Sequence, residues 1–149
     1  MVRRLFFILV LAGQLCATSL AQEEGLVLIA NPESGIKAMD RDTAINLFMG
    51  RFKKLPSGIT ALPLDLTGDR ETFYRQLVNK RLPEINSYWA RLVFSGRASP
   101  PRQIETPEEV LEIVANNRGA IGYVPRGATD DRVVVLADLF ALTERDTAP

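Results

Sequence analysis

Apolar residues in this chain gather into short unbroken runs, separated by stretches in which apolar positions recur with a helical period. An unbroken apolar run of strand length is typical of a strand buried on both faces of a sheet. Such runs cover Leu26 to Ala30, Ile59 to Leu66, Ala120 to Val124 and Val133 to Leu136. Helices are predicted over Thr43 to Met49, Thr67 to about Lys80, Leu82 to about Phe94, and from Pro107 onward. Strands that alternate with helices predict an α/β fold, a three-layer sandwich around a mixed, mostly parallel sheet.

Two glycines mark the third of these strands. Gly119 follows a helical stripe and is expected to end that helix, whereas Gly122 lies in the middle of the strand. A glycine weakens a strand, so its presence indicates a close approach, either of another part of the backbone or of a ligand.

The first 21 residues are predicted to be a cleavable secretory signal peptide rather than part of the fold. Arg3 and Arg4 precede an apolar run that is too short to cross a bilayer, which takes about 20 residues. Small residues at Ser19 and Ala21 place cleavage after Ala21. The prediction is therefore a periplasmic protein with one domain over residues 22–142 and a flexible tail over residues 143–149.

Composition removes several classes of function. The chain has 149 residues, no histidine and one cysteine, Cys16, which lies inside the predicted signal peptide. Nucleophile–histidine triads and the usual zinc sites are therefore excluded. The 18 basic residues equal the 18 acidic ones, so there is no electrostatic footprint for nucleic acid. We expect a protein that is not an enzyme and has no catalytic residues, cofactor or metal site. The alternative is a hydrolase that uses the carboxylate of Asp65 or Asp69.

The first candidate site is the strand-to-helix turn formed by Thr67, Gly68, Asp69 and Arg70. The first turn of a helix presents unpaired N–H groups that favour anions. Thr67 adds a hydroxyl, Gly68 lets a ligand approach the backbone, and Arg70 can hold an oxyanion. The alternative is that Thr67 or Asp69 simply caps the helix.

The second candidate is the loop containing Asn31, Ser34 and Gly35, which follows the first strand. In open α/β sheets, ligands bind outside the carboxyl ends of strands. The alternative there is an ordinary proline turn. A basic loop over residues 51–58 is interpreted as a solvated turn.

Several segments together resemble the phosphate-type periplasmic substrate-binding proteins. Ile45 to Phe52 is similar to the "IFxGKIxxW" segment of that family, and Gly119 to Val124 closely matches its "GAIGYV" strand. Arg70 to Phe73 lies where the family has the helix start after its phosphate loop, and Trp89 and Phe94 to Gly96 resemble the next segment. The resemblance runs from about Leu26 to Arg126 and implies one lobe of a type II periplasmic-binding protein, in a short, single-lobe version.

The resemblance implies a solute-binding domain for a small oxyanion such as phosphate, with Thr72 added to the site residues named above. The family's loop reads Arg-x-Asp-Gly-Ser-Gly-Thr, and its arginine position is Asp65 here. Carboxylates at Asp65, Asp69 and Glu71 repel phosphate, and Arg70 opposes them. The alternative is therefore a periplasmic interaction or sensor module that has lost phosphate binding. An envelope or transporter protein, or a homodimer, is the expected partner in that case.

Overall fold

The computed structural model describes residues 25–145, and the predicted signal peptide lies outside them. These residues form a five-stranded sheet in the order β3-β2-β4-β1-β5. The strands are β1 (Leu26–Ala30), β2 (Leu62–Leu66), β3 (Arg102–Ile104), β4 (Ala120–Pro125) and β5 (Val134–Asp138). β2 runs parallel to β3 and to β4, whereas β1 runs antiparallel to both of its neighbours, β4 and β5. The predicted mixed, mostly parallel sheet is therefore confirmed, with β1 as its one reversed strand.

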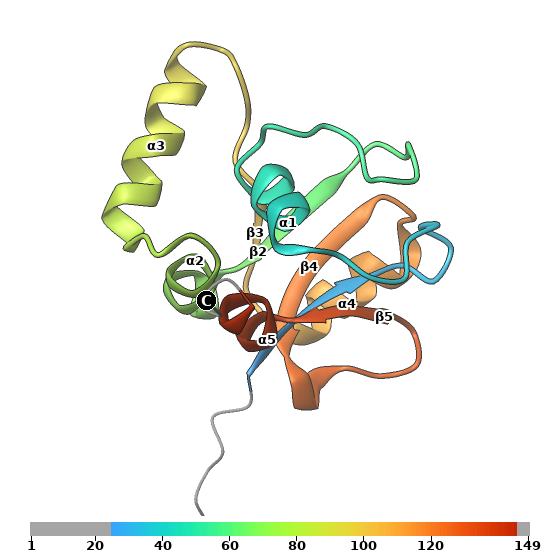
Figure 1. Ribbon diagram of the computed structural model, residues 1–149. Helices are drawn as coiled ribbons and strands as arrows, with labels where there is room; N and C mark the ends of the chain where they lie inside the picture. The colour runs from blue at the N-terminus through green and yellow to red at the C-terminus, as the bar shows by residue number, and fades with distance from the viewer. Residues whose placement is uncertain (1–24, 146–149) are drawn as a thin grey trace, which may run out of the picture.

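Helices cover both faces of the sheet, which makes three layers (Figure 1). They are α1 (Arg41–Phe48), α2 (Arg70–Val78), α3 (Leu82–Phe94), α4 (Pro107–Asn116) and α5 (Leu139–Glu144), with short 3-10 turns at Thr67–Asp69 and Arg126–Ala128. Gly122 of β4 faces α4, because an added Cβ there would lie 2.9 Å from Val110 Cγ1. The next residue, Tyr123, stacks on Phe73 of α2 on the other face. Within the described residues, no helix is both long and apolar enough to pass through a bilayer.

The differences from the sequence-based elements lie at short or polar segments. β2 begins at Leu62 rather than Ile59, because the preceding residues form a loop with an isolated bridge between Lys54 and Thr60. β3 and α5 were not expected, since three residues after a proline-containing connector carry no strand pattern. α5 runs to Glu144 and so extends into the predicted tail, where the Thr143 hydroxyl donates to the Gln76 carbonyl at 3.2 Å.

The two glycines around β4 are explained by close packing inside the protein. A Cβ on Gly119 would lie 2.1 Å from the Thr60 carbonyl oxygen, which is a backbone atom and cannot rotate away. The same stretch is held by the Leu62 amide, which donates to the Gly119 carbonyl at 2.8 Å. The close approach expected at Gly122 is made by the Val110 side chain, and Gly119 has a close backbone neighbour that was not expected.

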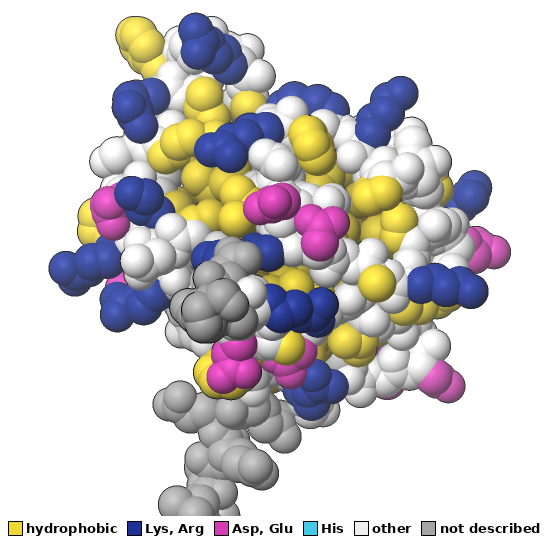
Figure 2. Space-filling view, in the orientation of Figure 1, with side chains coloured by type: hydrophobic (Ala, Val, Ile, Leu, Met, Phe, Trp, Pro, Cys, Tyr) yellow, Lys and Arg dark blue, Asp and Glu magenta, His cyan; other side chains and the backbone are white. Residues whose placement is uncertain are grey.

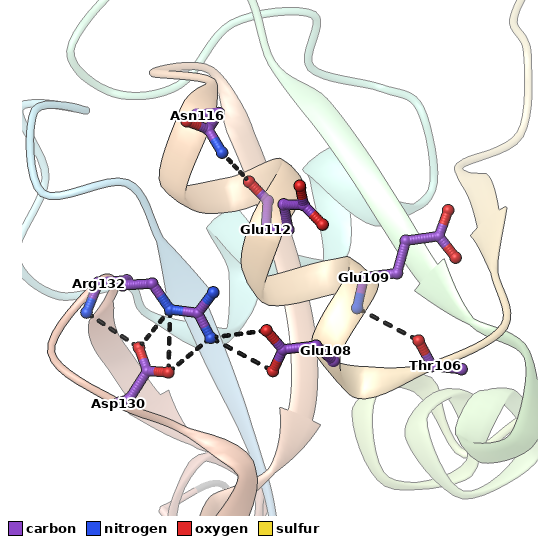
Figure 3. Close-up of polar contacts among 7 residues, drawn as sticks. All are labelled: Thr106, Glu108, Glu109, Glu112, Asn116, Asp130 and Arg132. Carbon is purple, nitrogen blue, oxygen red and sulfur yellow. Dashed lines mark hydrogen bonds and ion pairs between the residues drawn. The ribbon is translucent and has the colours of Figure 1, made fainter.

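The amino-terminal end of α4 is fixed by side chains from two segments (Figure 3). The Thr106 hydroxyl accepts a hydrogen bond from the Glu109 amide at 3.2 Å, which is the predicted N-cap. Arg132, in the loop before β5, pairs with Asp130 at 2.7 Å and with Glu108 in the first turn of α4 at 3.0 Å. These contacts attach the loop to the helix that covers this face of the sheet.

Replacing glycines by alanine tests this packing. Gly119→Ala is expected to lower the free energy of unfolding by about 1–3 kcal/mol or more, because the methyl group overlaps a backbone oxygen. Gly122→Ala is expected to cost less, since the Val110 side chain can shift. Gly68→Ala is the matched control, because nothing lies within 4 Å of its added Cβ. Urea unfolding of the three variants gives the order, and an unaffected Gly119→Ala protein would contradict the packing described here.

Candidate functional site

A carboxylate at the centre of the protein determines the structure of the predicted anion turn. Asp65 lies in β2, on the face covered by α1, α2 and α5, and is fully buried. Arg70, at the first position of α2, directs its side chain back under the turn, and its Nε donates to Asp65 Oδ2 at 2.9 Å. The Arg70 residue is only 8% exposed. The one cation of the predicted site therefore already has a carboxylate partner within the protein.

Two tyrosines complete the hydrogen bonding of Asp65. The Tyr74 hydroxyl lies 3.0 Å from Asp65 Oδ1 and 3.1 Å from Oδ2, and the Tyr123 hydroxyl donates to Oδ1 at 3.2 Å. The Arg70 guanidinium also lies over the Tyr74 ring, 5.9 Å from its centroid. A buried charge is tolerated when it is both paired and hydrogen-bonded, and this carboxylate meets both conditions.

Burial sets the protonation behaviour of these groups. It raises the pKa of the Asp65 carboxyl, while the Arg70 guanidinium and the tyrosine hydroxyls oppose the rise. Burial, reinforced by the neighbouring Asp65 carboxylate, raises the pKa of both Tyr74 and Tyr123. Both phenols therefore remain protonated at neutral pH and act as hydrogen-bond donors to Asp65.

The remaining residues of the turn offer no cation to an anion. The Thr67 hydroxyl lies 3.1 Å from the Ile104 carbonyl oxygen and 3.3 Å from a Glu105 carboxylate oxygen, and it donates its one proton to either acceptor, so it joins the end of β2 to the end of β3. Gly68 is exposed and faces open space. Asp69 and Thr72 line a groove of about 1040 Å³, which is also lined by Asp138 and Glu144. Asp138 is paired with Arg126, whereas the Asp69 carboxylate opposes the approach of an anion to the turn.

The second predicted loop lies at the other end of the sheet. β1 is reversed, so its last residue, Ala30, pairs with Ile121 near the start of β4, whereas Thr67 follows the carboxyl end of β2. The structure therefore does not bring the loop at Asn31 to Gly35 together with the turn at Thr67. The carboxyl end of β1 lies beside the amino-terminal end of its neighbour β4, so the rule that ligands bind at the carboxyl ends of parallel strands does not point to this loop.

Contacts within the protein account for the side chains of this loop. Asn31 Nδ2 donates to the Val114 and Ala115 carbonyls at 2.9 and 2.8 Å, which satisfies two acceptors at the end of α4. Ser34 is fully buried, and its hydroxyl accepts from the Ile36 amide at 3.4 Å. Gly35 adopts a positive φ of 79° in the same turn. The loop is thus an anchor for α4.

Sequence reasoning missed the role of three residues of the central network. Asp65 was considered as a charge that repels phosphate and as a carboxylate for hydrolysis, but not as a buried partner of Arg70, and the Tyr74 and Tyr123 hydroxyls were not considered at all. One signal was available: a carboxylate in an otherwise apolar strand must find a partner, and Arg70 is five positions away on the following helix.

With this geometry established, the chain can be compared with known proteins. No protein-family model and no curated protein sequence matches it significantly. Among solved structures, it is similar to an ABC-type phosphate transport receptor from Vibrio cholerae, with a TM-score of 0.59 and 13% identity. PstS from Borrelia burgdorferi gives a TM-score of 0.58 and 15% identity. A phosphate ABC transporter substrate-binding protein from Clostridium perfringens, with bound phosphate, gives a TM-score of 0.56 and 14% identity.

The fold is that of one lobe of a phosphate-type substrate-binding protein. The three matches cover 75%, 76% and 75% of this chain but only 45%, 46% and 44% of the other chains. The lobe therefore spans less than half the length of the proteins that it resembles. At 13–15% identity the similarity establishes the fold, and the binding properties of those proteins are not carried over with it.

Removing the buried carboxylate charge tests the network of the lobe. Asp65→Asn is expected to cost about 3–5 kcal/mol of unfolding free energy, because it leaves the Arg70 guanidinium buried without its counter-charge. Glu71→Gln is the matched control, since it removes a carboxylate from an exposed pair with Arg75 and is expected to cost at most about 0.5 kcal/mol. Denaturant unfolding of both variants is the measurement, and equal small losses would show that the network is dispensable.

Proposed function

We propose that this chain is a non-enzymatic, extracytoplasmic binding module that recognises a protein partner and does not capture free phosphate at its Thr67–Arg70 turn. One observation carries the proposal. Arg70, the cation that an oxyanion would need there, is buried and held by Asp65 at 2.9 Å. Freeing it for a ligand would break a buried ion pair and leave the Asp65 carboxylate uncompensated, which is strongly unfavourable.

Two kinds of observation support a role other than catalysis. The solved structures that share this fold are named as transport receptors or substrate-binding proteins, not as enzymes. The sequence contains no histidine. Among residues 25–145 there is also no group of three or more acidic, cysteine or histidine side chains arranged to hold a metal ion. Residues 25–145 therefore offer no recognisable set of catalytic roles.

The extracytoplasmic location rests on the amino-terminal sequence. Arg3 and Arg4, the following apolar run and the small residues Ser19 and Ala21 form the pattern of an exported precursor. A periplasmic module without a disulfide is stable only through its core, and the buried sheet provides that core. A partner in the envelope, such as a membrane transporter or sensor, is consistent with this location.

Oxyanion binding is the second candidate, and one observation favours it. A solved structure with the same fold holds phosphate. In this chain such binding would depend on Gly68 and the backbone N–H groups at the start of α2, without help from the Arg70 side chain. Binding of that kind is expected to be weak, because Asp69 and Glu71 lie in the same turn.

Anion titration separates the two candidates. Thermal unfolding of the exported chain is followed by Trp89 fluorescence, with phosphate and sulfate added to millimolar levels and sodium chloride as the ionic-strength control. A bound ligand at a hundredfold excess over its Kd stabilises a protein by about 2.7 kcal/mol. We expect phosphate and sulfate to change the melting temperature no more than sodium chloride does at the same ionic strength. A saturable phosphate-specific shift that disappears in Thr72→Ala or in Gly68→Pro would contradict the proposal and favour oxyanion binding.

A further inference from the structure

A second concave surface lies at the other edge of the sheet, between α3 and the amino-terminal ends of β2 and β3. We call it the α3 groove, and its volume is about 560 Å³. The residues that matter for its chemistry are Phe52, Lys53, Trp89, Val93, Arg97 and Arg102. Figure 1 shows α3 standing away from the sheet, with the chain after it returning to β3. The groove is therefore separate from the Thr67–Arg70 turn, which lies at the carboxyl ends of the parallel strands.

The α3 groove carries positive charge that the described part of the chain does not neutralise. Lys53, Arg97 and Arg102 are all exposed, and no aspartate or glutamate lines the groove. Within residues 25–145, none of the three side chains forms a hydrogen bond or an ion pair. Four cations elsewhere on the surface do have carboxylate partners; these are Arg75, Lys80, Arg126 and Arg132, the last shown in Figure 3. The charge of the groove is thus available to a partner.

Apolar surface lies next to these cations. Trp89 forms part of the wall and is 4% exposed, whereas Phe52 and Val93 are 49% and 53% exposed. Phe94, the last residue of α3, is 96% exposed. Figure 2 shows hydrophobic side chains gathered beside α3, with Lys and Arg side chains around them. Exposed apolar side chains that cluster inside a polar rim mark interaction surfaces more often than isolated ones do.

We propose that the α3 groove binds an acidic segment of a partner protein that also carries apolar side chains. The inference rests on the proposed function as a protein-binding module and names the chemistry of the partner. Carboxylates of the segment pair with Lys53, Arg97 and Arg102, and its apolar side chains pack against Trp89 and Val93. Charge complementarity of this kind provides specificity and accelerates association.

The shape of the groove favours a peptide over a lipid surface. Its volume lies within the roughly 300–1,000 Å³ of typical ligand pockets, so it accommodates a few side chains. A membrane surface would instead need cations displayed on one flat or convex face. Here the cations come from three separate segments, the loop before β2, the connector after α3 and the start of β3, and they surround a hollow.

Fluorescence anisotropy with a synthetic probe tests the proposal. The probe is a fluorescein-labelled peptide of alternating glutamate and phenylalanine or leucine, and the control peptide has lysine in place of glutamate. We expect saturable binding of the acidic probe that weakens as salt is added, and none of the lysine peptide. Arg97→Glu/Arg102→Glu is expected to weaken binding roughly tenfold or more. Val93→Ser is expected to weaken it without changing its salt dependence.

The matched control is Lys37→Glu/Arg75→Glu, which changes the net charge equally but lies outside the groove. Its affinity for the probe is expected to stay within about twofold of that of the unmodified chain, because both replaced side chains lie outside the groove. Circular dichroism confirms that each variant folds. The proposal would be overturned if the two double variants lost the same affinity for the acidic probe, or if the probe showed no saturable binding to the unmodified chain.

Two further outcomes assign the groove to other occupants and also overturn the proposal. One is groove-dependent sedimentation with vesicles of anionic lipid when the acidic peptide does not bind. The other is self-association of the chain that Arg97→Glu/Arg102→Glu abolishes. Inorganic phosphate is added to the same samples as a separate probe. A phosphate-specific stabilisation of the protein would refute the proposed function itself. If the acidic peptide does not bind and phosphate has no effect, only the proposal for the α3 groove is refuted.

Discussion

The rest of the structure depends on one constraint: the charge of Asp65, at the centre of β2, must be compensated inside the core. The carboxylate accepts hydrogen bonds from Arg70 at 2.9 Å, from Tyr74 at 3.0 Å and from Tyr123 at 3.2 Å. These donors come from the start of α2, its second turn, and β4, so satisfying one charge fixes the position of a helix against two strands. The stacked rings of Phe73 and Tyr123, 3.7 Å apart, close the apolar side of the same contact. A buried network in which each group is satisfied is rigid and specifies one arrangement.

The two ends of the sheet differ in which side chains are held inside the protein and which are exposed. At the carboxyl ends of the parallel strands, the Arg70 side chain is directed into the core and Thr67 links β2 to β3. The turn that resembles an anion site therefore makes its contacts within the protein. The polar groups around it that remain exposed are mainly carboxylates. At the opposite edge, the α3 groove has exposed cations beside exposed apolar side chains. The same fold holds phosphate in a larger protein, and we propose that the contacts of this chain lie elsewhere on its surface.

Much of the fold could be predicted from the sequence, because the apolar runs that form β1 and β4 and the cap at Thr106 are local signals. β3 and α5 could not, since a three-residue edge strand and a six-residue helix acquire their structure from neighbours. The direction of β1 also has no local signal, so the sequence could not show that the loop at Asn31 and the turn at Thr67 lie at opposite ends of the sheet. The direction of the Arg70 side chain depends on Tyr74 and Tyr123, and Tyr123 is distant from it in sequence. The position of the turn could therefore be predicted from the sequence, but the burial of the Arg70 side chain could not.

The central claim is that Arg70 belongs to the core and is not available to a ligand. Nitrogen-15 NMR of the Arg70 Nε–H group, assigned by comparison with Arg70→Lys, measures this directly in the presence and absence of phosphate. The account predicts a resolved signal that exchanges slowly with water and keeps its position as phosphate is added. A signal that exchanges rapidly, and that moves with phosphate along a saturable curve, would contradict it.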